Sequence, residues 1–192
     1  MNQDHVRQAL IDGTIHVIAQ KGLDKATTRL ISIETDTNEA YIYRCFADKE
    51  DLFAKTFDFL DTELLTKAMN HVAIMHEKAL EPELRARAYF ESVWKFLLGN
   101  KEKCLVFMQY YYSPYFVKYS YPCHCQRYQP LVEKFSEIFK PDADTWMILN
   151  HILNVMLGFA VKVHNGQMPE ADDYPEHVFR VVYESVKQYF RD

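Results

Sequence analysis

Apolar and polar residues recur at helical spacing along almost the whole chain. Val6, Leu10 and Val17, for example, fall on one face of a predicted helix that Gly22 ends. Because the chain has only five glycines and few strand-and-turn clusters, the pattern predicts an all-α fold. The expected helices cover residues 4–21, 28–35, 39–45, 49–80, 84–98, two segments within 101–140, 143–166 and 175–190.

Two of the predicted helices are short and are separated by a polar turn. The first covers residues 28–35, and the turn formers Asp36 and Thr37 interrupt its apolar pattern. Asn38 is a good N-cap for the second, residues 39–45, because its side-chain oxygen can accept a hydrogen bond from an otherwise unpaired backbone N–H. Two short helices joined by such a turn form a helix-turn-helix, whose second helix enters the DNA major groove.

The stretch that follows carries a more specific pattern. Its spacing fits I-Y-x-x-F-x-x-K-x-x-L, and the matching stretch includes Tyr43, Phe46, Lys49, Glu50 and Leu52. This pattern resembles the one that marks the tetracycline-repressor (TetR) family of transcriptional regulators. Asp36 stands where that family usually has a turn glycine, and Asp tolerates left-handed backbone better than most residues. The resemblance implies a three-helix DNA-binding module in residues 1–48, joined by a long helix to a ligand-binding and dimerisation domain in residues 49–192.

Two predicted helix N-termini flank the second short helix. Thr27 is the expected N-cap of the first short helix and leaves Thr28 and Arg29 in its first turn. Asp48 likewise caps the long helix that begins at Lys49. Helix N-termini attract phosphate through free N–H groups and the macrodipole, so both ends could hold DNA backbone. The alternative is plain capping with no part in binding.

Several side chains of this region are candidates for DNA contact. The resemblance implies that Tyr43 and Lys49 contact phosphate, whereas Arg44 faces outward and could reach a base edge. The full predicted set is Thr27, Thr28, Arg29, Asn38, Glu39, Tyr41, Tyr43, Arg44 and Lys49.

The charge balance does not support DNA binding. The chain has a net charge of −5, and residues 1–50 hold six Lys or Arg against eight Asp or Glu. A basic footprint is the usual sign of a DNA-binding domain, because phosphate neutralisation dominates affinity. An alternative therefore stays open, in which the chain is a helical ligand-binding or interaction protein that does not bind DNA.

Aromatic residues are concentrated in the middle of the chain. Residues 101–140 hold 11 of the 28 aromatic residues, and Pro114 and Pro122 are expected to break any long helix there. A cavity lined by aromatic side chains with scattered polar groups is typical of small-molecule sites, although ordinary packing would also use such residues. The predicted ligand contacts are Trp94, Phe107, Tyr110, Tyr111, Tyr115 and Tyr119.

The sequence Cys123-His124-Cys125 raises the question of metal or thiol chemistry. Adjacent residues seldom converge on one ion, and zinc sites usually leave two to four residues between cysteines, so we predict no metal and no cofactor. An enzyme that uses these thiols or the imidazole is a further alternative, but no nucleophile–base–orienter set is recognisable. The four cysteines are expected to be reduced thiols.

The helix predicted over residues 143–166 is apolar on nearly all sides and must therefore be buried on more than one face. The simplest second partner is the same helix pair of another subunit, and the resemblance implies such a four-helix homodimer interface. The predicted interface residues are Leu149, Leu153, Met156, Val178, Val182 and Val186.

Together these patterns predict a ligand-responsive transcriptional regulator that binds double-stranded operator DNA as a homodimer. Repression relieved by a small lipophilic or aromatic molecule is the commoner behaviour in the family that the chain resembles, while activation stays open. We expect a cytoplasmic protein with no membrane partner, because no apolar run reaches about 18–20 residues. The N-terminal residues 1–22 also lack the basic-then-apolar order of a signal peptide.

Overall fold

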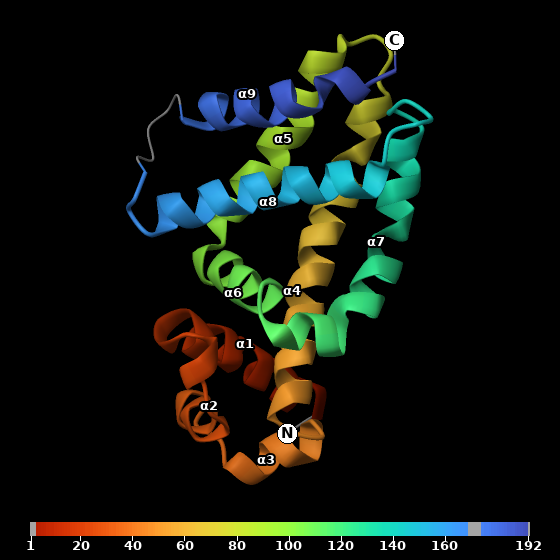
Figure 1. Ribbon diagram of the computed structural model, residues 1–192. Coiled ribbons are helices and arrows are strands. Elements are labelled where there is room, and N and C mark those ends of the chain that lie inside the picture. Colours follow the sequence, from red (N-terminus) through yellow and green to blue (C-terminus); the bar gives the residue numbers. More distant parts are fainter. Residues whose placement is uncertain (1–2, 169–173, 192) are drawn as a thin grey trace. The chain divides into compact units, whose positions relative to one another are not determined.

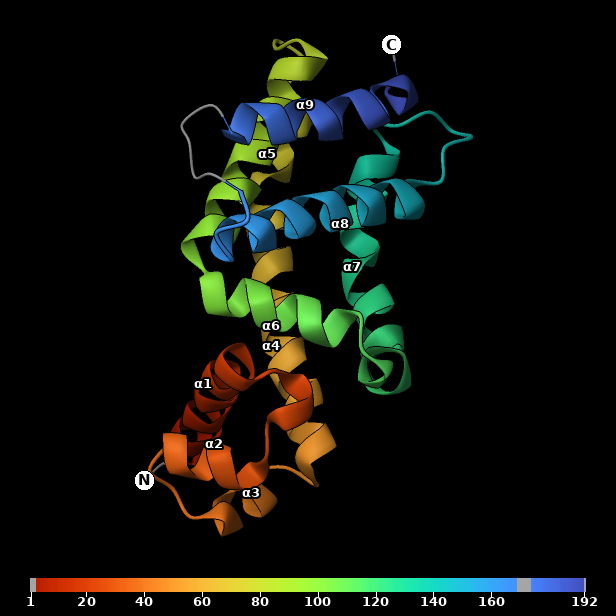
Figure 2. The same ribbon diagram turned by 60° about the vertical axis from the view of Figure 1, so that its left-hand side comes forward.

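The computed structural model describes residues 3–168 and 174–191. Within these residues every regular element is a helix, apart from one isolated bridge between Phe139 and Phe190. This confirms the all-α prediction. The chain forms two compact units, the first made of residues 1–62 and 102–125 and the second of residues 63–101 and 126–192 (Figures 1 and 2).

The first unit contains the N-terminal helices and the aromatic segment in the middle of the chain. Its helices are α1 (Gln3–Lys21), the 3-10 turn η1 (Leu23–Lys25), α2 (Thr28–Glu34), α3 (Glu39–Cys45), the first part of α4 (Lys49–His71), α6 (Lys101–Tyr111), the π-helical turn η3 (Phe116–Ser120) and the start of α7 (Tyr121–Ser136). Helix α1 packs against α2 and α3. Leu10, Ile31 and Ile42, one from each of these helices, are fully buried and form the centre of the three-helix module.

A close approach between α1 and the end of α2 depends on Gly13. A β-carbon added at Gly13 would lie 2.2 Å from Cγ2 of Thr35, which is far inside van der Waals contact. The small residues Gly13 and Thr14 predict a place where another helix can approach α1 closely. Thr14 is fully buried, and its hydroxyl donates to the carbonyl of Leu10.

The second unit contains the remaining helices. They are the end of α4, the 3-10 turn η2 (Val72–His76), α5 (Pro82–Gly99), the rest of α7, α8 (Thr145–His164), α9 (Tyr174–Val186) and the 3-10 turn η4 (Lys187–Tyr189). Helices α8 and α9 lie side by side and run in opposite directions, and α5 packs against both (Figures 1 and 2). Buried apolar residues of α4, α7 and α8, among them Ala68, Phe135 and Ile148, form one core cluster.

The end of α4 and the course of the chain at Pro122 differ from the sequence prediction. Helix α4 ends at His71 instead of continuing to about residue 80, and a 3-10 turn follows in which Val72 and Met75 are buried. Pro122 does not break a helix, because the π-helical turn η3 runs directly into α7 and the helical course continues past the proline. The wider π-helical turn directly before it is the kind of irregularity that relieves a clash with the proline ring.

Helix α8 is apolar on several sides, as the sequence predicts. Among the described residues it is the one helix long and apolar enough to cross a membrane by length and composition, although Asn150, His151 and Asn154 interrupt its apolar residues. A core helix of a soluble protein passes the same test. Many of its apolar residues, such as Leu149 and Leu153, are only half-buried within the chain, and Met147 is exposed.

Candidate nucleic-acid interface and effector site

The turn between α2 and α3 has the hydrogen bonds and backbone conformation of a common helix C-terminal motif. The N–H of Asp36 donates to the carbonyl of Ile33 at 3.2 Å, and the N–H of Thr37 donates to the carbonyl of Ser32 at 2.9 Å. These two bonds, with Asp36 at a φ of 48°, form a Schellman motif in which aspartate takes the left-handed position usually given to glycine. The turn therefore forms without a glycine.

Both short helices begin at the predicted caps. The side chain of Thr27 accepts from the N–H of Leu30 at 3.2 Å, and the side chain of Asn38 accepts from the N–H of Ala40 at 2.9 Å. Asp48 accepts from the N–H of Asp51 at 2.7 Å and so caps α4. In all three caps the side-chain oxygen accepts a backbone N–H, so part of its hydrogen-bonding capacity is already used.

The outer surface of the module carries most of the predicted DNA contacts. Five of the predicted residues are exposed: Arg29, Asn38, Tyr41, Tyr43 and Arg44. Of the two tyrosines, Tyr43 is the more exposed, at 58%. The guanidinium of Arg44 lies over the ring of Tyr41, 5.1 Å from its centroid, which holds both side chains on the outer face of α3.

Lys49 is less free than expected. Its side chain is half-buried, with Nζ 5.4 Å from the ring centroid of Phe53 and 3.9 Å from a carboxylate oxygen of Glu50. A phosphate contact from Lys49 would therefore compete with Glu50.

Thr28 and Glu39 are joined in a contact that the sequence did not reveal. The hydroxyl of Thr28, the first residue of α2, donates to Oε1 of Glu39, the first residue of α3. In this arrangement the hydroxyl is directed at a neighbouring carboxylate. The sequence also did not reveal that Ile33 lies on the exposed face of α2. It is 67% exposed, because helical rotation places it on a different face from the buried Ile31 two residues earlier.

Five of the six predicted ligand contacts lie in the first unit, where they cluster around Phe57 of α4. Its ring centroid is 5.0 Å from that of Phe107 and 4.9 Å from that of Tyr110, both of which are buried. Tyr111 is half-buried, and its ring centroid is 5.6 Å from that of Phe107. Burial raises the pKa of Tyr110 and of Tyr111 to about 12, so both phenols stay neutral.

The cluster opens toward solvent along the tyrosines after α6. Tyr115 stacks between Tyr110 and Tyr119 at centroid distances of 6.4 Å to each, and Tyr119 is 39% exposed. The hydroxyl of Tyr110 lies 3.1 Å from Oγ of Ser120, so this buried phenol has a polar partner. Phe107 and Tyr110 are therefore core residues, while Tyr111, Tyr115 and Tyr119 retain open surface.

The sixth predicted contact, Trp94, belongs to the second unit. It is buried and stacks on Phe90 at a centroid distance of 5.7 Å. Its indole Nε1 and Oγ of Ser92 are buried without a hydrogen-bond partner among the described residues. A buried donor with no acceptor is costly, so α5 carries polar groups that a polar ligand atom or a water could satisfy.

His124 is buried and does not project toward its neighbouring cysteines. Its Nδ1 lies 3.0 Å from both carboxylate oxygens of Asp61, and both side chains are almost fully buried in the first unit. Cys123 is exposed and Cys125 half-buried, and both thiols are free, as are those of Cys45 and Cys104. The described residues hold no group of three or more metal-ligating side chains.

The residues predicted for the dimer interface do not all face outward. Met156, Val178, Val182 and Val186 are at most 6% exposed within one chain, so they belong to the core of the second unit. Apolar periodicity alone cannot tell which of two apolar faces of a helix points outward. Leu149 and Leu153 are half-buried. The open apolar side chains of the two helices are Met147, 59% exposed, and Val181, 52% exposed.

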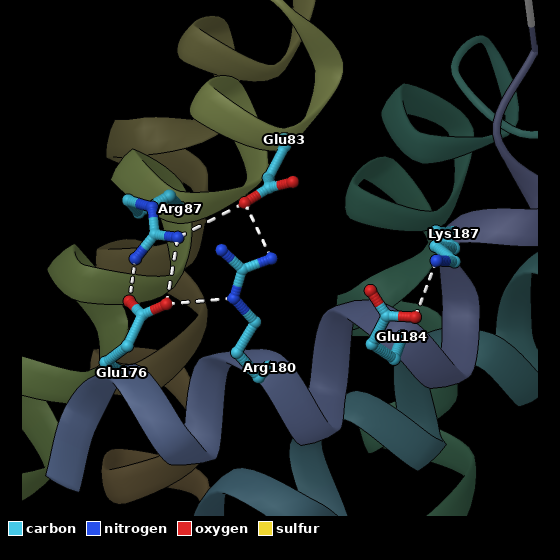
Figure 3. A network of polar contacts seen from close by, with 6 residues as sticks. All are labelled: Glu83, Arg87, Glu176, Arg180, Glu184 and Lys187. Atoms are coloured by element: carbon cyan, nitrogen blue, oxygen red, sulfur yellow. Dashed lines mark hydrogen bonds and ion pairs between the residues drawn. The ribbon is translucent and has the colours of Figure 1, made fainter.

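A network of ion pairs joins α9 to α5 (Figure 3). Arg87 of α5 donates to both carboxylate oxygens of Glu176, and Arg180 Nε donates to Glu176 at 2.9 Å. Both arginines also contact Glu83, at 3.3 and 3.0 Å. Hydrogen bonding from Arg87 lowers the pKa of the Glu176 carboxyl, which is therefore ionised at neutral pH.

The fold and the module define a class of protein: an all-α chain in which a small helix-turn-helix unit precedes a larger helical region. Residues 10–56 match the model of the family described as bacterial regulatory proteins, tetR family. This match and the structural likenesses below confirm the resemblance. Residues 10–56 therefore match the N-terminal domain of the tetR family of bacterial regulatory proteins, and the whole chain has the fold of solved tetR-family regulators.

Solved structures share the fold over nearly the whole chain. A TetR family transcription regulator from Marinobacter aquaeolei VT8 is 16% identical, with a TM-score of 0.76 over 95% of each chain. A transcriptional regulator from Rhodococcus sp. Rha1 is 16% identical, with a TM-score of 0.71 over 95% of this chain and 96% of the other. The multidrug binding protein EbrR, complexed with imidazole, is 16% identical, with a TM-score of 0.65 over 92% of this chain and 93% of its own. No curated protein sequence matches the chain.

Proposed function

We propose that the chain is a DNA-binding transcriptional regulator rather than an enzyme, and that it acts in the cytoplasm. The observation that carries this proposal is the geometry of α2 and α3. A Schellman turn ends the first of these helices, Asn38 caps the second, and α3 presents Tyr41, Tyr43 and Arg44 to solvent. An exposed second helix after a tight turn is the element that enters the major groove in helix-turn-helix proteins.

The acidic balance of residues 1–50 limits how this module would bind. With six cations against eight acids, it would bind DNA weakly without specific contacts, because phosphate neutralisation supplies non-specific affinity. Affinity would then depend on the exposed cations Arg29 and Arg44 and on favourable contacts with particular base pairs. We therefore place the DNA-contact role in Thr27, Arg29, Tyr41, Tyr43, Arg44 and Lys49, with Asn38 as a cap that fixes the start of α3.

A small lipophilic or aromatic molecule is proposed as the effector. Two sets of side chains support it: the open tyrosines Tyr111, Tyr115 and Tyr119, and the buried Trp94 and Ser92 on α5 whose polar atoms lack partners in the described chain. EbrR, a multidrug binding protein, has a similar fold. Helix α4 contributes residues to both units, so it is the covalent path along which binding would alter DNA affinity. Repression that the effector relieves is the behaviour that we propose.

A homodimer through α8 and α9 is the proposed assembly. Several apolar residues of α8 are only half-buried within one chain, and Met147 and Val181 are exposed apolar side chains on these two helices. Large apolar surface of this kind is usually covered by a partner, and two-fold contacts are the commonest solution. A dimer would place two copies of α3 to meet successive major grooves, about 34–36 Å apart.

The test of DNA binding is fluorescence anisotropy with labelled duplexes that cover the DNA flanking the protein's own gene. We expect one duplex to bind more tightly than an unrelated duplex of equal length, and binding to weaken steeply as salt rises. Lys49→Ala and Tyr43→Phe should weaken binding to all duplexes alike, whereas Arg44→Ala should also reduce the preference. Lys95→Ala is the matched control, because it removes one exposed cation from α5, outside the module.

Equal binding to every duplex, unaffected by these substitutions, would contradict the proposed function. It would favour the alternative, a helical ligand-binding or interaction protein that does not bind DNA. For the effector, the same assay repeated with a panel of lipophilic aromatic compounds should identify compounds that both release the duplex and raise the melting temperature of the free protein.

A further inference from the structure

Glu39 is the first residue of the exposed helix α3, and its carboxylate lies at the end of that helix. We propose that Glu39 is a specificity-determining residue that accepts a hydrogen bond from the exocyclic N4 amino group of a cytosine in the major groove. This inference rests on the proposed function, since it concerns how the module would choose its DNA sequence.

The position of Glu39 on α3 is the one from which a side chain reaches bases. Residues at the N-terminal end of a recognition helix contact base edges, and α3 begins at Glu39 after its cap Asn38. Glu39 is half-buried, and the hydroxyl of Thr28 donates to its Oε1. That bond fixes the direction of a side chain that would otherwise sample several rotamers, so little conformational freedom is left to lose on binding.

The carboxylate still has acceptor capacity. An ionised carboxylate offers about four lone-pair positions on two oxygens, and Thr28 occupies one of them. The ion pairs and hydrogen bonds found for the described residues include no cationic partner of Glu39, so its charge is not consumed by an arginine or a lysine. The group is therefore a fixed acceptor with no donor of its own.

The chemistry of the major groove then favours cytosine. Only two bases present a donor there, cytosine through N4 and adenine through N6. Adenine places the acceptor N7 beside its amino group, which repels a carboxylate, whereas the C5 neighbour of N4 in cytosine carries only C–H. Guanine and thymine present acceptors at the corresponding positions, so the carboxylate would face another acceptor with no donor between them, which is costly.

The acid also acts against non-specific binding. A carboxylate near phosphates is repelled, and residues 1–50 already carry more acids than cations. Without a base donor in reach, Glu39 weakens binding; with one, the hydrogen bond offsets the repulsion. A glutamate at this site therefore widens the difference between matched and unmatched sequences, which is how a repulsive element produces specificity.

A structural role is the competing explanation, in which the Thr28–Glu39 bond merely fixes the angle between α2 and α3. Glu39→Gln distinguishes the two, because the amide oxygen can still accept from Thr28 while the charge is removed and an N–H donor is added. Glutamine pairs with adenine through its N6 and N7, so this variant should change which base is preferred without disturbing the helices.

The experiment is selection of bound duplexes from a randomised library, followed by sequencing, with wild-type protein, Glu39→Gln and Glu39→Ala. Wild type should favour a C·G pair at one position of each half-site by at least about fivefold over the other pairs. Glu39→Gln should shift that position toward A·T, and Glu39→Ala should lose the preference while binding random duplexes more tightly. Glu34→Gln is the matched control: it removes one partly exposed acid from α2 and should leave the selected sequence unchanged.

The outcomes separate the inference from the proposed function. If wild type and Glu39→Gln select the same sequence, with unchanged preference at every position, Glu39 does not read a base and the inference is wrong while DNA binding stands. If wild type enriches no sequence at all, the proposed function fails and the inference fails with it. Melting temperatures measured for each variant show whether a lost preference reflects unfolding, and Glu39→Gln is the variant that should keep the wild-type value.

Discussion

The imidazole of His124 donates from Nδ1 to the carboxylate of Asp61, with 3.0 Å to each oxygen, although the two residues are 63 positions apart. Both are almost completely buried in the first unit, and the rings of Phe57, Tyr111 and Phe116 lie around the imidazole at centroid distances of 6.3, 5.7 and 5.4 Å. The pair joins α4 to α7 inside an aromatic core, where a polar group without its partner is expensive.

The first prediction is that replacing either residue of this pair alone strongly destabilises the fold. Asp61→Leu or His124→Leu should lower the free energy of unfolding by about 3–5 kcal/mol, because each leaves a buried polar or charged group without its partner. The double variant should recover part of that loss, since it removes both members of the buried pair and leaves neither without the other. Urea unfolding followed by circular dichroism measures all three.

The matched control is the exposed pair of His16 and Glu102 in the same unit, whose atoms are 3.0 Å apart while both side chains are at least 40% exposed. Glu102→Gln should cost less than about 1 kcal/mol, as exposed ion pairs do. Equal losses for the buried and exposed pairs would show that burial of Asp61 and His124 does not set their importance.

The second prediction concerns the pH dependence of stability in the second unit. Because Arg87 lowers the pKa of Glu176 in the folded chain, ionised Glu176 stabilises the fold at pH values above the usual glutamate pKa of about 4.3. That contribution is lost as the pH falls through the lowered pKa. The melting temperature of wild type should exceed that of Glu176→Gln at pH 7, and the difference should vanish in strong acid.

The control for this measurement is Glu184→Gln, which removes an acid from the same helix but outside the four-residue network, where its partner is Lys187 (Figure 3). This single exposed pair should contribute less at neutral pH. A wild-type advantage over Glu176→Gln that stays constant down to pH 2 would mean that ionisation of Glu176 is not its source.

The third prediction tests the close approach at Gly13. Gly13→Ala should destabilise the fold by about 1–3 kcal/mol through overpacking, although alanine normally favours a helix over glycine. Thr35 cannot easily move aside, because its hydroxyl donates to the carbonyl of Ile31. The same hydroxyl lies 2.8 Å from the hydroxyl of Thr37. Gly99→Ala is the control, since a β-carbon there would meet no atom within 4 Å. A more stable Gly13→Ala variant would show that α1 and α2 can separate without cost.

Local features of the fold followed from the sequence. Thr27 and Asn38 cap α2 and α3 as predicted, and α3 covers Glu39–Cys45, the predicted range, because caps and turn formers act on their own neighbours. Asp36 takes the left-handed conformation expected for its turn. The end of α4 at His71 was missed, since an apolar pattern continues through residues 72–76 in a 3-10 turn.

Contacts between distant segments could not be predicted. Nothing local in Cys123-His124-Cys125 indicates that the histidine pairs with Asp61, and the bond from Thr28 to Glu39 depends on the angle at which two helices meet. The dimer residues show the same limit. Helix α8 is apolar on several sides, so periodicity alone could not decide that Met156 faces the core of its own chain while Met147 is open.

The last prediction uses that difference to test the proposed dimer. Val181→Glu and Met147→Glu place a charge on open apolar side chains of α9 and α8, so each should separate the subunits while leaving a folded monomer. Val182→Glu is the matched control one residue away: Val182 is only 6% exposed within the chain, so a charge there should instead unfold the second unit. Sedimentation velocity gives the subunit mass and circular dichroism the helix content. Sedimentation of wild type as a monomer at micromolar concentration would contradict the dimer, and a folded dimer of Val181→Glu and Met147→Glu combined would move the interface away from this face of α8 and α9.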